Sequence, residues 1–511
     1  MKKLVSLLFH RVGIVAVALV AQLLLLIVMT GWFSQYFQYF YWFCLIISFL
    51  VLLWILDNRS DPAYKIAWIV PILAFPVFGG VLYLLIGGSR ISYRTMRKMQ
   101  HMERKMTKVL SPDFKAEKLA EYGKDAVNQA KYLENVAKCP VYDRTETEYF
   151  GSGEAFFSSL LEELRQAKKY IFLEYFIIEE GSMWNAILAI LKEKAAGGVD
   201  VRLIYDDLGS IFTLPSDYGE QMEALGIRCE VFNPFLPIAS IRLNNRDHRK
   251  LCIIDGRVGF TGGINLADEY INEKVRFGHW KDSGILVRGA AAWSMTVMFL
   301  ATWEHLTDEE DEYDDYRPPV SGINSTGYVQ PYLDTPLDHE AVGQSVYLNM
   351  ISRAKDYIYI TTPYLIVDHA MNTALCNAAK SGVDIRIITP HIPDKKSVFE
   401  VTRAHYPPLL EAGVHIYEYT PGFIHAKNMV SDDLFATVGT VNLDYRSFFL
   451  HFEDGVWLCG TTSVHDVKAD FLETLKACEE MTMEMTREEH RSMGLLKRLW
   501  RSILRAFAPL M

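Results

Sequence analysis

The sequence predicts an α/β protein built from two similar halves, which follow an N-terminal membrane-embedded helical region. Three observations predict this fold class. At 511 residues, the chain is too long for a single hydrophobic core. Apolar runs fill its first 90 residues, whereas strand-like segments rich in β-branched residues alternate with helical segments further on. Several of those segments recur roughly 180 to 190 residues later, so a whole half-domain is repeated.

Residues 1–90 are the predicted membrane anchor. The apolar run at residues 12–33 is long enough to span a bilayer and lacks the cleavage site of a signal peptide. A second run covers residues 40–56. The third, residues 66–86, contains two prolines and a glycine pair, which predict a kinked or re-entrant segment. Because basic residues flank the region at both ends, we expect two full spans in the cell membrane, with the rest of the chain in the cytoplasm.

Residues 91–140 are predicted to form a basic juxtamembrane helical linker. Basic residues alternate there with Met96, Met99, Met102 and Met106 at helical spacing. Methionines at this spacing either pack into a core or mark a basic amphipathic helix on an anionic membrane. The sequence leaves both interpretations open.

The two halves are predicted at residues 141–307 and 326–482. AKKYIFLEYFII in the first half is echoed by AKDYIYITTPYLIV in the second, and GVDVRLIYDD is echoed by GVDIRIITPH. Residues 308–325 between them are rich in acidic residues and proline, which predicts a solvated linker. A metal-binding acidic loop is the alternative, although the EF-hand spacing is absent.

Residues 483–511 close the chain with a predicted basic amphipathic helix. Four basic residues fall on one side of this helix, and aromatic and apolar residues fall on the other. This pattern is typical of a helix that lies in a membrane interface. Packing against the protein body is the alternative interpretation.

Charge and cysteine content narrow the function. The net charge of −10 argues against bulk nucleic-acid binding, which needs a cationic face. The seven cysteines are scattered, and none shows the spacing of a zinc site. We therefore expect reduced thiols, no disulfide framework, no metal and no cofactor.

One polar pattern occurs twice in the chain, and it carries the functional prediction. The first copy spans NNRDHRKLCIIDGRVGFTGGIN, and the second spans GFIHAKNMVSDDLFATVGTVN. The same residue types recur at the same offsets: His248, Lys250, Asp255, Gly262 and Asn265 in the first copy, and His425, Lys427, Asp432, Gly439 and Asn442 in the second. Five matching residue types at equal offsets predict that both copies contribute to one site.

Each copy is predicted to be a β-hairpin. In the first, residues 250–254 form one strand, Asp255 and Gly256 form the turn, and residues 257–261 return. In the second, residues 427–430 rise, residues 431–433 turn and residues 434–438 return. Since residues i and i+2 of a strand point to one face, the histidine and lysine of each copy project together. The return strand brings the asparagine back to the same end.

These side chains suit a phosphodiester. Lysine donates to non-bridging oxygens as a point charge, and asparagine adds a neutral donor. Imidazole attacks phosphorus or moves a proton near neutral pH, so two facing histidines can act as nucleophile and acid. We therefore predict Asn265 and Asn442 as substrate contacts, with no metal required.

The carboxylates of this region divide into two groups. Asp255 and Asp432 belong to the repeated catalytic pattern, but their position in the turns favours a supporting role. An imidazole that must hold one tautomer usually has a carboxylate behind it. Glu453 is the candidate after the second copy, and Asp282 is the candidate after the first. Asp268 and Glu269 are nearer in sequence and compete with Asp282.

Both copies fit H-x-K-x4-D followed by G-[GST]-x-N, and at these residues the chain resembles the phospholipase D superfamily. Within it, the chain is similar to bacterial cardiolipin synthases in WIVPILAFPVFGGVLYLLIGG, in TTPYLIVD, in GTVNLDYRSFFLHFE and in the basic-aromatic C-terminus. The resemblance implies two phospholipase D-like α-β-α sandwich halves related by a pseudo-two-fold axis. Two features depart from it: His451 stands where such synthases usually have asparagine, and the run at residues 12–33 is additional.

The resemblance implies a phosphatidyl transfer. One imidazole, by family habit His248, would attack the phosphorus of phosphatidylglycerol while His425 protonates the departing glycerol. The phosphohistidine would then pass its phosphatidyl group to a second phosphatidylglycerol at an anionic membrane surface, giving cardiolipin. Which histidine is the nucleophile stays open, as does a homo-oligomer. A phospholipase D-type hydrolase, another headgroup transferase and a catalytically dead membrane scaffold are the alternatives.

Overall fold

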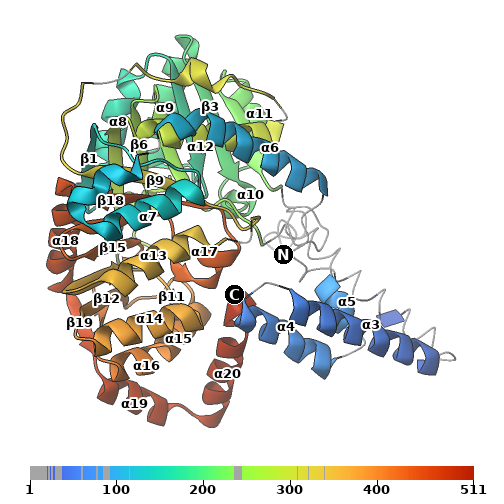
Figure 1. Cartoon of the computed structure of the whole chain (residues 1–511). Coiled ribbons are helices and arrows are strands. Elements are labelled where there is room, and N and C mark those ends of the chain that lie inside the picture. The colour runs from blue at the N-terminus through green and yellow to red at the C-terminus, as the bar shows by residue number, and fades with distance from the viewer. Residues whose placement is uncertain are drawn as a thin grey trace. The chain divides into compact units, whose positions relative to one another are not determined.

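The computed structural model describes residues 37–58, 61–75, 79–84, 93–113, 115–234, 244–307, 309–319, 322–338 and 340–510, together with residues 20, 24, 27 and 28. The chain forms two compact units. The smaller contains the residues up to 92 with 233–245, and the larger contains 93–232 and 246–509. Both predicted halves therefore lie in one unit, drawn from cyan to red in Figure 1.

The smaller unit contains three described helices, α3 (Phe37–Asp57), α4 (Pro62–Ala74) and α5 (Gly79–Leu82). The Asp61 side chain caps α4 by accepting from the backbone N–H groups of Ala63 and Tyr64, with Pro62 at the first helical position. The second apolar run is thus helical, and the third is interrupted after Ala74, as its prolines and glycines predict. The run at residues 12–33 lies almost entirely outside the described residues.

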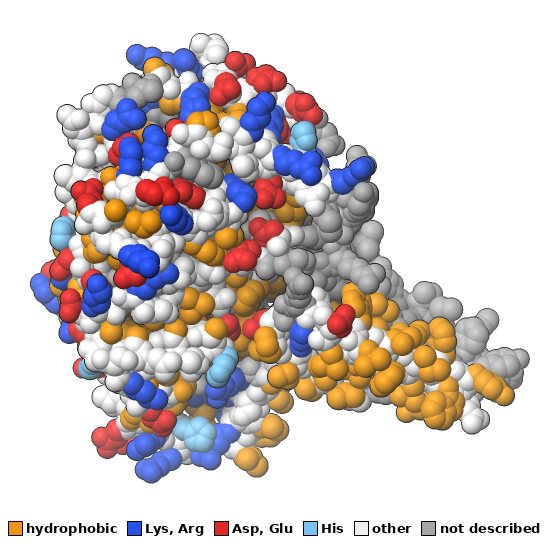
Figure 2. Space-filling model, in the orientation of Figure 1, with side chains coloured by type: hydrophobic (Ala, Val, Ile, Leu, Met, Phe, Trp, Pro, Cys, Tyr) orange, Lys and Arg blue, Asp and Glu red, His pale blue; other side chains and the backbone are white. Residues whose placement is uncertain are grey.

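No helix among the described residues has both the length and the apolar content needed to span a membrane. The predicted spans are therefore not confirmed. Apolar side chains nevertheless lie on the surface of α3 and α4, where Figure 2 shows them gathered into one patch; they include Phe43, Ile46, Phe49, Leu50, Leu53, Ile66, Val70 and Leu73.

The first half is built on a seven-stranded sheet in the order β1-β8-β6-β5-β2-β3-β4. β2, β3 and β4 are parallel neighbours, and all other pairs are antiparallel. The strands are β1 (Thr145–Phe150), β2 (Tyr170–Tyr175), β3 (Asp200–Asp206), β4 (Arg228–Phe232), β5 (Lys250–Ile254), β6 (Val258–Gly262) and β8 (Gly284–Gly289). The helices are α8 (Gly153–Gln166), α9 (Ser182–Ala196), α10 (Asp207–Ser210), α11 (Tyr218–Glu223) and α12 (Ala292–Thr307).

The second half repeats this order in an eight-stranded sheet, β19-β13-β12-β10-β15-β16-β18-β9, with β19 as the additional edge strand. The strands are β9 (Tyr328–Asp334), β10 (Tyr357–Thr361), β12 (Asp384–Pro390), β13 (His415–Tyr419), β15 (Asn428–Ser431), β16 (Phe435–Gly439), β18 (Glu453–Cys459) and β19 (Cys478–Met481). The helices are α13 (Val342–Arg353), α14 (His369–Lys380), α15 (Lys396–Ala404), α16 (Tyr406–Glu411), α17 (Tyr445–Phe449) and α18 (Thr462–Leu475). The predicted α/β repeat is therefore confirmed.

The two sheets face each other across a shared apolar core. Strand side chains alternate between faces, so Phe172 and Ile253 of the first sheet point to this shared core, while Ile171 and Ile254 point to an outer core beneath α8 and α9. Val438 of the second sheet joins the same shared core, together with residues of α12 and α18. Because this core is common to both halves, they pack as one compact unit.

Two short backbone contacts also join the halves. β7 (His279–Lys281) pairs in parallel with β14 (Gly422–Ile424), so Trp280 lies opposite Phe423. An isolated parallel bridge joins Asp247 to Phe452. Each of these contacts brings a segment of one half beside the histidine of the other.

Residues 93–140 of the predicted linker belong to the larger unit. The first helix of the linker, α6 (Tyr93–Leu110), packs against α12, and its second, α7 (Lys124–Asn135), packs against α13. Met106 is buried in the shared core and Met102 packs against that core. Of the two interpretations of the methionine pattern, the structure supports core packing for these two residues.

The acidic segment between the halves is anchored rather than fully solvated. Asp311 forms a two-pronged ion pair with Arg202, and Glu309 pairs with Arg228. Within the described part of the segment, these acidic side chains meet arginines instead of converging as a metal-binding loop. The expectation of a solvated linker is therefore wrong for Asp311.

The C-terminal segment forms two helices instead of one, α19 (Met483–Ser492) and α20 (Leu495–Ala506). α20 packs against α15, and two of its four basic side chains bind that helix: Lys497 lies 2.9 Å from Glu400, and Arg501 also pairs with Glu400. Its other side is exposed, with Leu495, Leu496, Leu499, Trp500 and Ile503. The predicted amphipathic helix is present as α20, and two basic side chains bind it to α15.

Candidate active site

The repeated hairpins form as predicted, with small shifts at their ends. In the first hairpin, Cys252 of β5 lies opposite Phe260 of β6, and Ile254 lies opposite Val258. In the second, Asn428 of β15 lies opposite Val438 of β16, and Ser431 lies opposite Phe435. Each loop is three residues long and places its aspartate in the left-handed region, at φ 51° for Asp255 and φ 55° for Asp432. Aspartate tolerates this conformation better than most residues, which explains its place in both turns.

The two turn aspartates support the fold at the far end of the strands. The Asp255 carboxylate accepts from the backbone N–H groups of Lys168, Lys169 and Tyr170 at 2.7–3.0 Å. Asp432 accepts in the same way from residues 355, 356 and 357. These contacts tie each hairpin to the start of β2 or β10, so the structure gives both aspartates the supporting role and places neither beside the histidines.

The histidine and lysine of each copy do lie together at the other end. His248 and His425 are each 7% exposed, and Lys250 and Lys427 are each 1% exposed. The Lys250 ammonium donates to the His248 carbonyl at 2.6 Å, and Lys427 makes the same contact with His425. Each ammonium is thereby held beside its own histidine, with no acidic side chain opposite it as a hydrogen-bond partner among the described residues.

Each imidazole is paired with a carboxylate from the opposite half. His248 Nδ1 lies 3.0 Å from both carboxylate oxygens of Glu453, and His425 Nδ1 lies 2.8 Å from Asp282 Oδ2. Glu453 and Asp282 are fully buried. Sequence order had placed each carboxylate behind the histidine of its own half, and this assignment is wrong. The two residues are the predicted partners, but the pairing is crossed.

Backbone hydrogen bonds between the halves explain the crossing. The His248 N–H donates to the Phe452 carbonyl at 2.9 Å, one residue before Glu453. The His425 N–H donates to the Lys281 carbonyl at 2.7 Å, one residue before Asp282. The competitors Asp268 and Glu269 are used elsewhere, since Asp268 caps α9 through the N–H groups of Ser182 and Met183 and Glu269 pairs with Arg276.

The two carboxylates are held by different neighbours. Glu453 accepts a hydrogen bond from the Thr440 hydroxyl. Asp282 instead accepts from the Ser283 N–H at 2.8 Å and from Trp280 Nε1 at 3.4 Å. Gly263, the counterpart of Thr440, has no room for a side chain, because a Cβ there would lie 2.1 Å from Asp282 Oδ1. The glycine of the first motif is thus required by the position of Asp282.

The two asparagines predicted as equivalent substrate contacts differ in the structure. Asn265 Oδ1 accepts from the Ile177 N–H at 3.0 Å, and its Nδ2 donates to the Tyr270 hydroxyl at 2.7 Å. Asn442 Oδ1 is buried and has no partner among the described residues. Asn265 therefore fixes the Tyr270 ring, which packs at 5.6 Å against His425, whereas Asn442 retains an acceptor for a ligand.

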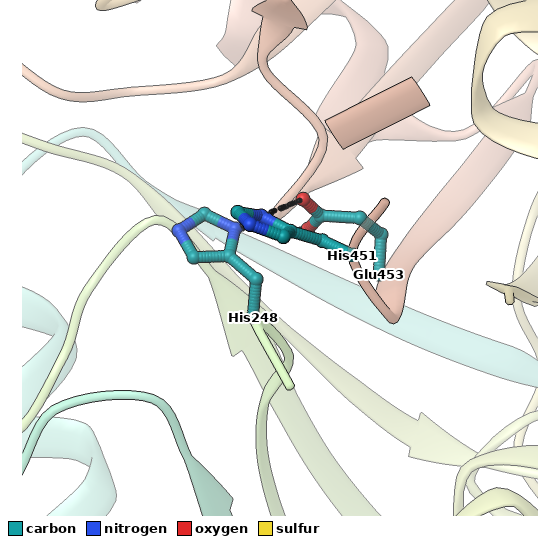
Figure 3. Close-up of side chains that lie close together, drawn as sticks. All are labelled: His248, His451 and Glu453. Carbon is teal, nitrogen blue, oxygen red and sulfur yellow. Dashed lines mark hydrogen bonds and ion pairs between the residues drawn. The ribbon is translucent and has the colours of Figure 1, made fainter. Parts of the chain in front are cut away.

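Sequence reasoning missed the aromatic neighbours of the histidines. The Phe176 ring lies 5.2 Å from the His248 ring, and the Trp280 ring lies 5.5 Å from the His425 ring. His451, noted only as a departure from the family pattern, lies 5.5 Å from the His248 ring (Figure 3). One signal for two of these rings was present in the sequence. Glu453 ends the triplet HFE and Asp282 ends the triplet WKD, so an aromatic ring stands two residues before each carboxylate.

Burial sets the protonation of the site. It lowers the pKa of His248 to about 3 and that of His425 to about 4, with the lysines acting in the same direction. Burial also lowers the pKa of Lys250 to about 8 and that of Lys427 to about 7. Burial alone would raise the pKa of Glu453, but the His248 contact outweighs it and the pKa falls below its usual range.

Both imidazoles are therefore neutral near pH 7 and donate Nδ1–H to an ionised carboxylate, so the lone pair of each histidine is on Nε2. Two lysines without carboxylate partners beside two neutral imidazoles attract an anion. The donor set suits a phosphoryl group, with ammonium groups for its oxygens and Nε2 for its phosphorus.

His248, His451 and Glu453 also form a group whose ligand atoms lie within 4.8 Å of one another, a donor set of the kind that holds zinc (Figure 3). Lys250 lies beside this group and lowers the pKa of His248 by its charge. The same charge disfavours a cation, so the arrangement fits an anion better than a metal.

Comparisons with known proteins agree with this geometry. A family model described as "Cardiolipin synthase, PLD-like domain" matches residues 160–275 and 347–475, one stretch in each half, and a "Phospholipase_D-nuclease N-terminal" model matches residues 46–88. An uncharacterized protein of Streptococcus mutans is 44% identical over 87% of this chain and 96% of its own length. A protein of Geobacillus kaustophilus named cardiolipin synthase is 36% identical over 91% of this chain and 92% of its own.

The fold is also similar to a solved structure. The phosphatidylserine synthase of Haemophilus influenzae aligns with a TM-score of 0.55 over 74% of this chain and 100% of its own, at 13% identity. This likeness shows the two-sheet phospholipase D-like α/β fold. With a matched domain in each half and relatives that align over most of both chains, the chain belongs to the cardiolipin synthase family of phospholipase D-like proteins.

Proposed function

We propose that this protein is a cardiolipin synthase, which transfers a phosphatidyl group from one phosphatidylglycerol to another and releases glycerol. The observation that carries the proposal is the pair of neutral imidazoles, each with a carboxylate from the other half, beside two buried lysines. Relatives named cardiolipin synthase that align over most of this chain support the choice of substrate.

In the first step, His248 Nε2 attacks phosphorus and the bond from phosphorus to the glycerol oxygen breaks. Glu453 stabilises the charge that develops on the His248 ring by accepting its Nδ1–H. Binding of the anionic phosphodiester favours the protonated form of His425, which takes up a proton on Nε2 and then donates it to the departing glycerol oxygen, while Asp282 holds the His425 ring in place. Lys250 and Lys427 bind the non-bridging oxygens, whereas Asn442 Oδ1 is placed to accept a hydrogen bond from a donor group of the substrate. We assign the nucleophile to His248 by family resemblance.

In the second step, the primary hydroxyl of another phosphatidylglycerol gives its proton to His425 and attacks the phosphohistidine. The bond from phosphorus to His248 Nε2 breaks, and cardiolipin forms. Each histidine thus returns to its starting protonation state. No metal or cofactor enters this scheme, since the two lysines neutralise the developing charge.

One assay tests the proposal. The purified full chain is incubated with phosphatidylglycerol labelled in its acyl chains, and the lipids are separated by chromatography. Cardiolipin with an equal amount of glycerol is the expected result. Phosphatidic acid as the main product would assign the chain to the hydrolases, and no turnover would contradict an enzymatic function. A stable phosphoenzyme in His425→Ala but not in His248→Ala would identify His248 as the nucleophile.

We also propose that the protein works at the cell membrane, with the N-terminal region embedded in it and the larger unit in the cytoplasm. The exposed apolar side chains of α3 and α4 support this location, as does the N-terminal family match at residues 46–88. An anionic bilayer would also supply the substrate. Sedimentation of the protein with membranes after a carbonate wash tests the embedding, and loss of the protein to the supernatant would contradict it.

A further inference from the structure

His451 and Trp280 occupy equivalent places around the two imidazoles. Each stands two residues before a carboxylate, Glu453 or Asp282, that is paired with the histidine of the other half. Each ring also packs against the histidine that this carboxylate holds, at 5.5 Å between ring centroids. The two histidines thus have similar surroundings, which differ in the ring, in the carboxylate and in the other donors to that carboxylate.

The two rings relate differently to their carboxylates. Trp280 Nε1 donates to Asp282 at 3.4 Å. His451 Nδ1 lies 3.8 Å from Glu453 Oε1, and both of its ring nitrogens are buried without a hydrogen-bond partner among the described residues. A buried polar group left without a partner is costly, and a shift of less than about 1 Å would close the contact with Glu453.

The position of His451 is fixed by backbone contacts. Its N–H donates to the Arg446 carbonyl at 2.8 Å, and the next N–H, of Phe452, donates to the Arg246 carbonyl at 2.8 Å. The second contact belongs to the bridge that sets His248. His451, Glu453 and His248 are thus placed by one set of hydrogen bonds, which holds the His451 ring against the reacting imidazole.

We propose that His451 is a positioning residue that weakens the hold of Glu453 on His248 and so makes this imidazole less basic. In this role its Nδ1–H turns to the Glu453 carboxylate, which lies 3.8 Å away in the structure, as Trp280 Nε1–H donates to Asp282. Trp280 can only donate a hydrogen bond, whereas His451 can also gain or lose a proton. The basicity of His248 therefore depends on the protonation of His451, and the basicity of His425 has no such dependence on Trp280.

The charged groups around His451 agree with this role. Glu453 favours its protonation, Arg446 opposes it, and Asp444 on the strand before α17 favours it. His248 and its neighbour Lys250 face it from the first half. Burial lowers the pKa of His451, so the ring is neutral near pH 7 and donates without adding a full positive charge.

The test uses two substitutions of His451. For each variant, glycerol release from phosphatidylglycerol is measured as a function of pH. Asparagine places Nδ2 where histidine has Nδ1, so His451→Asn keeps the donor, whereas His451→Phe keeps only the ring. Without the donor, Glu453 binds His248 more strongly and raises its pKa. The acidic limb of kcat/KM is therefore expected to move up by about one pH unit in His451→Phe and to stay in place in His451→Asn.

His405→Phe and His405→Asn are the matched controls, since His405 is equally buried and bonds only the Val401 carbonyl. Neither control is expected to move the limb. An unmoved limb in His451→Phe would overturn the proposal, and so would an equal shift in both His451 variants, which would assign the effect to packing.

A second measurement needs no turnover. Carbethoxylation of His248 by diethyl pyrocarbonate requires the neutral imidazole, so its rate against pH, read by mass spectrometry, follows the His248 pKa. The midpoint is expected to rise in His451→Phe alone. The inference rests on the proposed function only in taking His248 as a reacting imidazole. A chain that makes no cardiolipin would refute the proposed function, while this midpoint would still decide the role of His451.

Discussion

At the residue scale, the buried carboxylate of Glu453 determines the protonation of His248. It fixes the tautomer of His248, so that Nδ1 carries the proton and Nε2 carries the lone pair. Glu453→Gln keeps the shape but removes the charge that stabilises the imidazolium-like intermediate. We expect kcat to fall by about a hundredfold or more. The rate of glycerol release at saturating phosphatidylglycerol measures this change in kcat.

The control for this change is Glu418→Gln. Glu418 is also fully buried but pairs with Arg403 outside the site. It is expected to lower stability without a comparable loss of kcat in the folded fraction. Similar losses of kcat in both variants would show that the Glu453 effect comes from misfolding.

The lowered pKa values of the two imidazoles predict proton uptake on anion binding. A bound anion favours the charged form of a nearby imidazole, so it raises the His425 pKa from about 4 towards neutrality. Sulfate is a suitable probe because it does not titrate near pH 6. Calorimetry in two buffers of different ionisation enthalpy should show protons entering the protein, and His425→Asn should reduce that number. Binding without proton uptake would contradict the role of His425 as the acid.

At the element scale, the hairpin turns carry stability rather than chemistry. Asp255→Ala leaves three backbone N–H groups without their acceptor, and we expect a loss of about 2–4 kcal/mol in the free energy of unfolding. Turnover per folded molecule should change little. Denaturant unfolding and kcat on the same preparation measure both.

Asp433→Ala is the matched control in the other hairpin. Asp433 stands in the second turn but bonds side chains, those of Tyr357 and Lys468, at the surface. Its loss is expected to cost less than about 1 kcal/mol. A drop in kcat for Asp255→Ala without loss of stability would return this residue to the catalytic set.

The exposed apolar side of helix α20 predicts an effect on activity at a membrane surface. Because Lys497 and Arg501 bind Glu400, the exposed Leu496 and Leu499 are the side chains turned outward, towards a bilayer in the proposed setting. Leu499→Asp should reduce activity on phosphatidylglycerol vesicles severalfold and leave activity on detergent-dispersed short-chain lipid unchanged. Ser502→Asp, an equal charge change on the same helix, is the control. Equal losses on both substrates would argue against a membrane contact.

The sequence predicted the individual structural elements well, but it did not predict the contacts between them. The hairpins, the repeat and the residues of the site follow from local periodicity and turn chemistry. The crossed pairing does not, since it depends on the three-residue strands β7 and β14, whose pairing partner lies in the other half. Likewise, the ring contact of His451 with His248 depends on the bridge between Asp247 and Phe452, which no local pattern encodes.

At the scale of the whole molecule, several buried histidines make stability depend on pH. The pKa is lowered to about 3 in His248 and to about 4 in His405 and His425, whereas these groups titrate near 6.5 once unfolded. The unfolded chain then binds more protons below pH 6.5, so stability is full above that pH and is lost as pH falls towards 4. Each group contributes up to about 1.4 kcal/mol per pH unit in this window.

Thermal unfolding of the detergent-solubilised protein checks this expectation. The midpoint should be nearly constant from pH 7 to 8 and should fall steadily below about pH 6.5. His405→Asn should flatten the decline, because one proton-linked group is removed outside the site. A midpoint that rises on acidification would contradict the neutral, buried state of these imidazoles.

The crossed carboxylates also have a consequence for how the enzyme is made. The ribosome delivers the N-terminal region and the first half before β18, which carries Glu453, has left the exit tunnel. During that interval His248 has no carboxylate behind it. We therefore expect an incomplete chain not to hydrolyse membrane lipids, and we expect reactivity to begin only when the second half has docked. A nascent chain arrested before residue 453 is accordingly expected to be inert beside the bilayer.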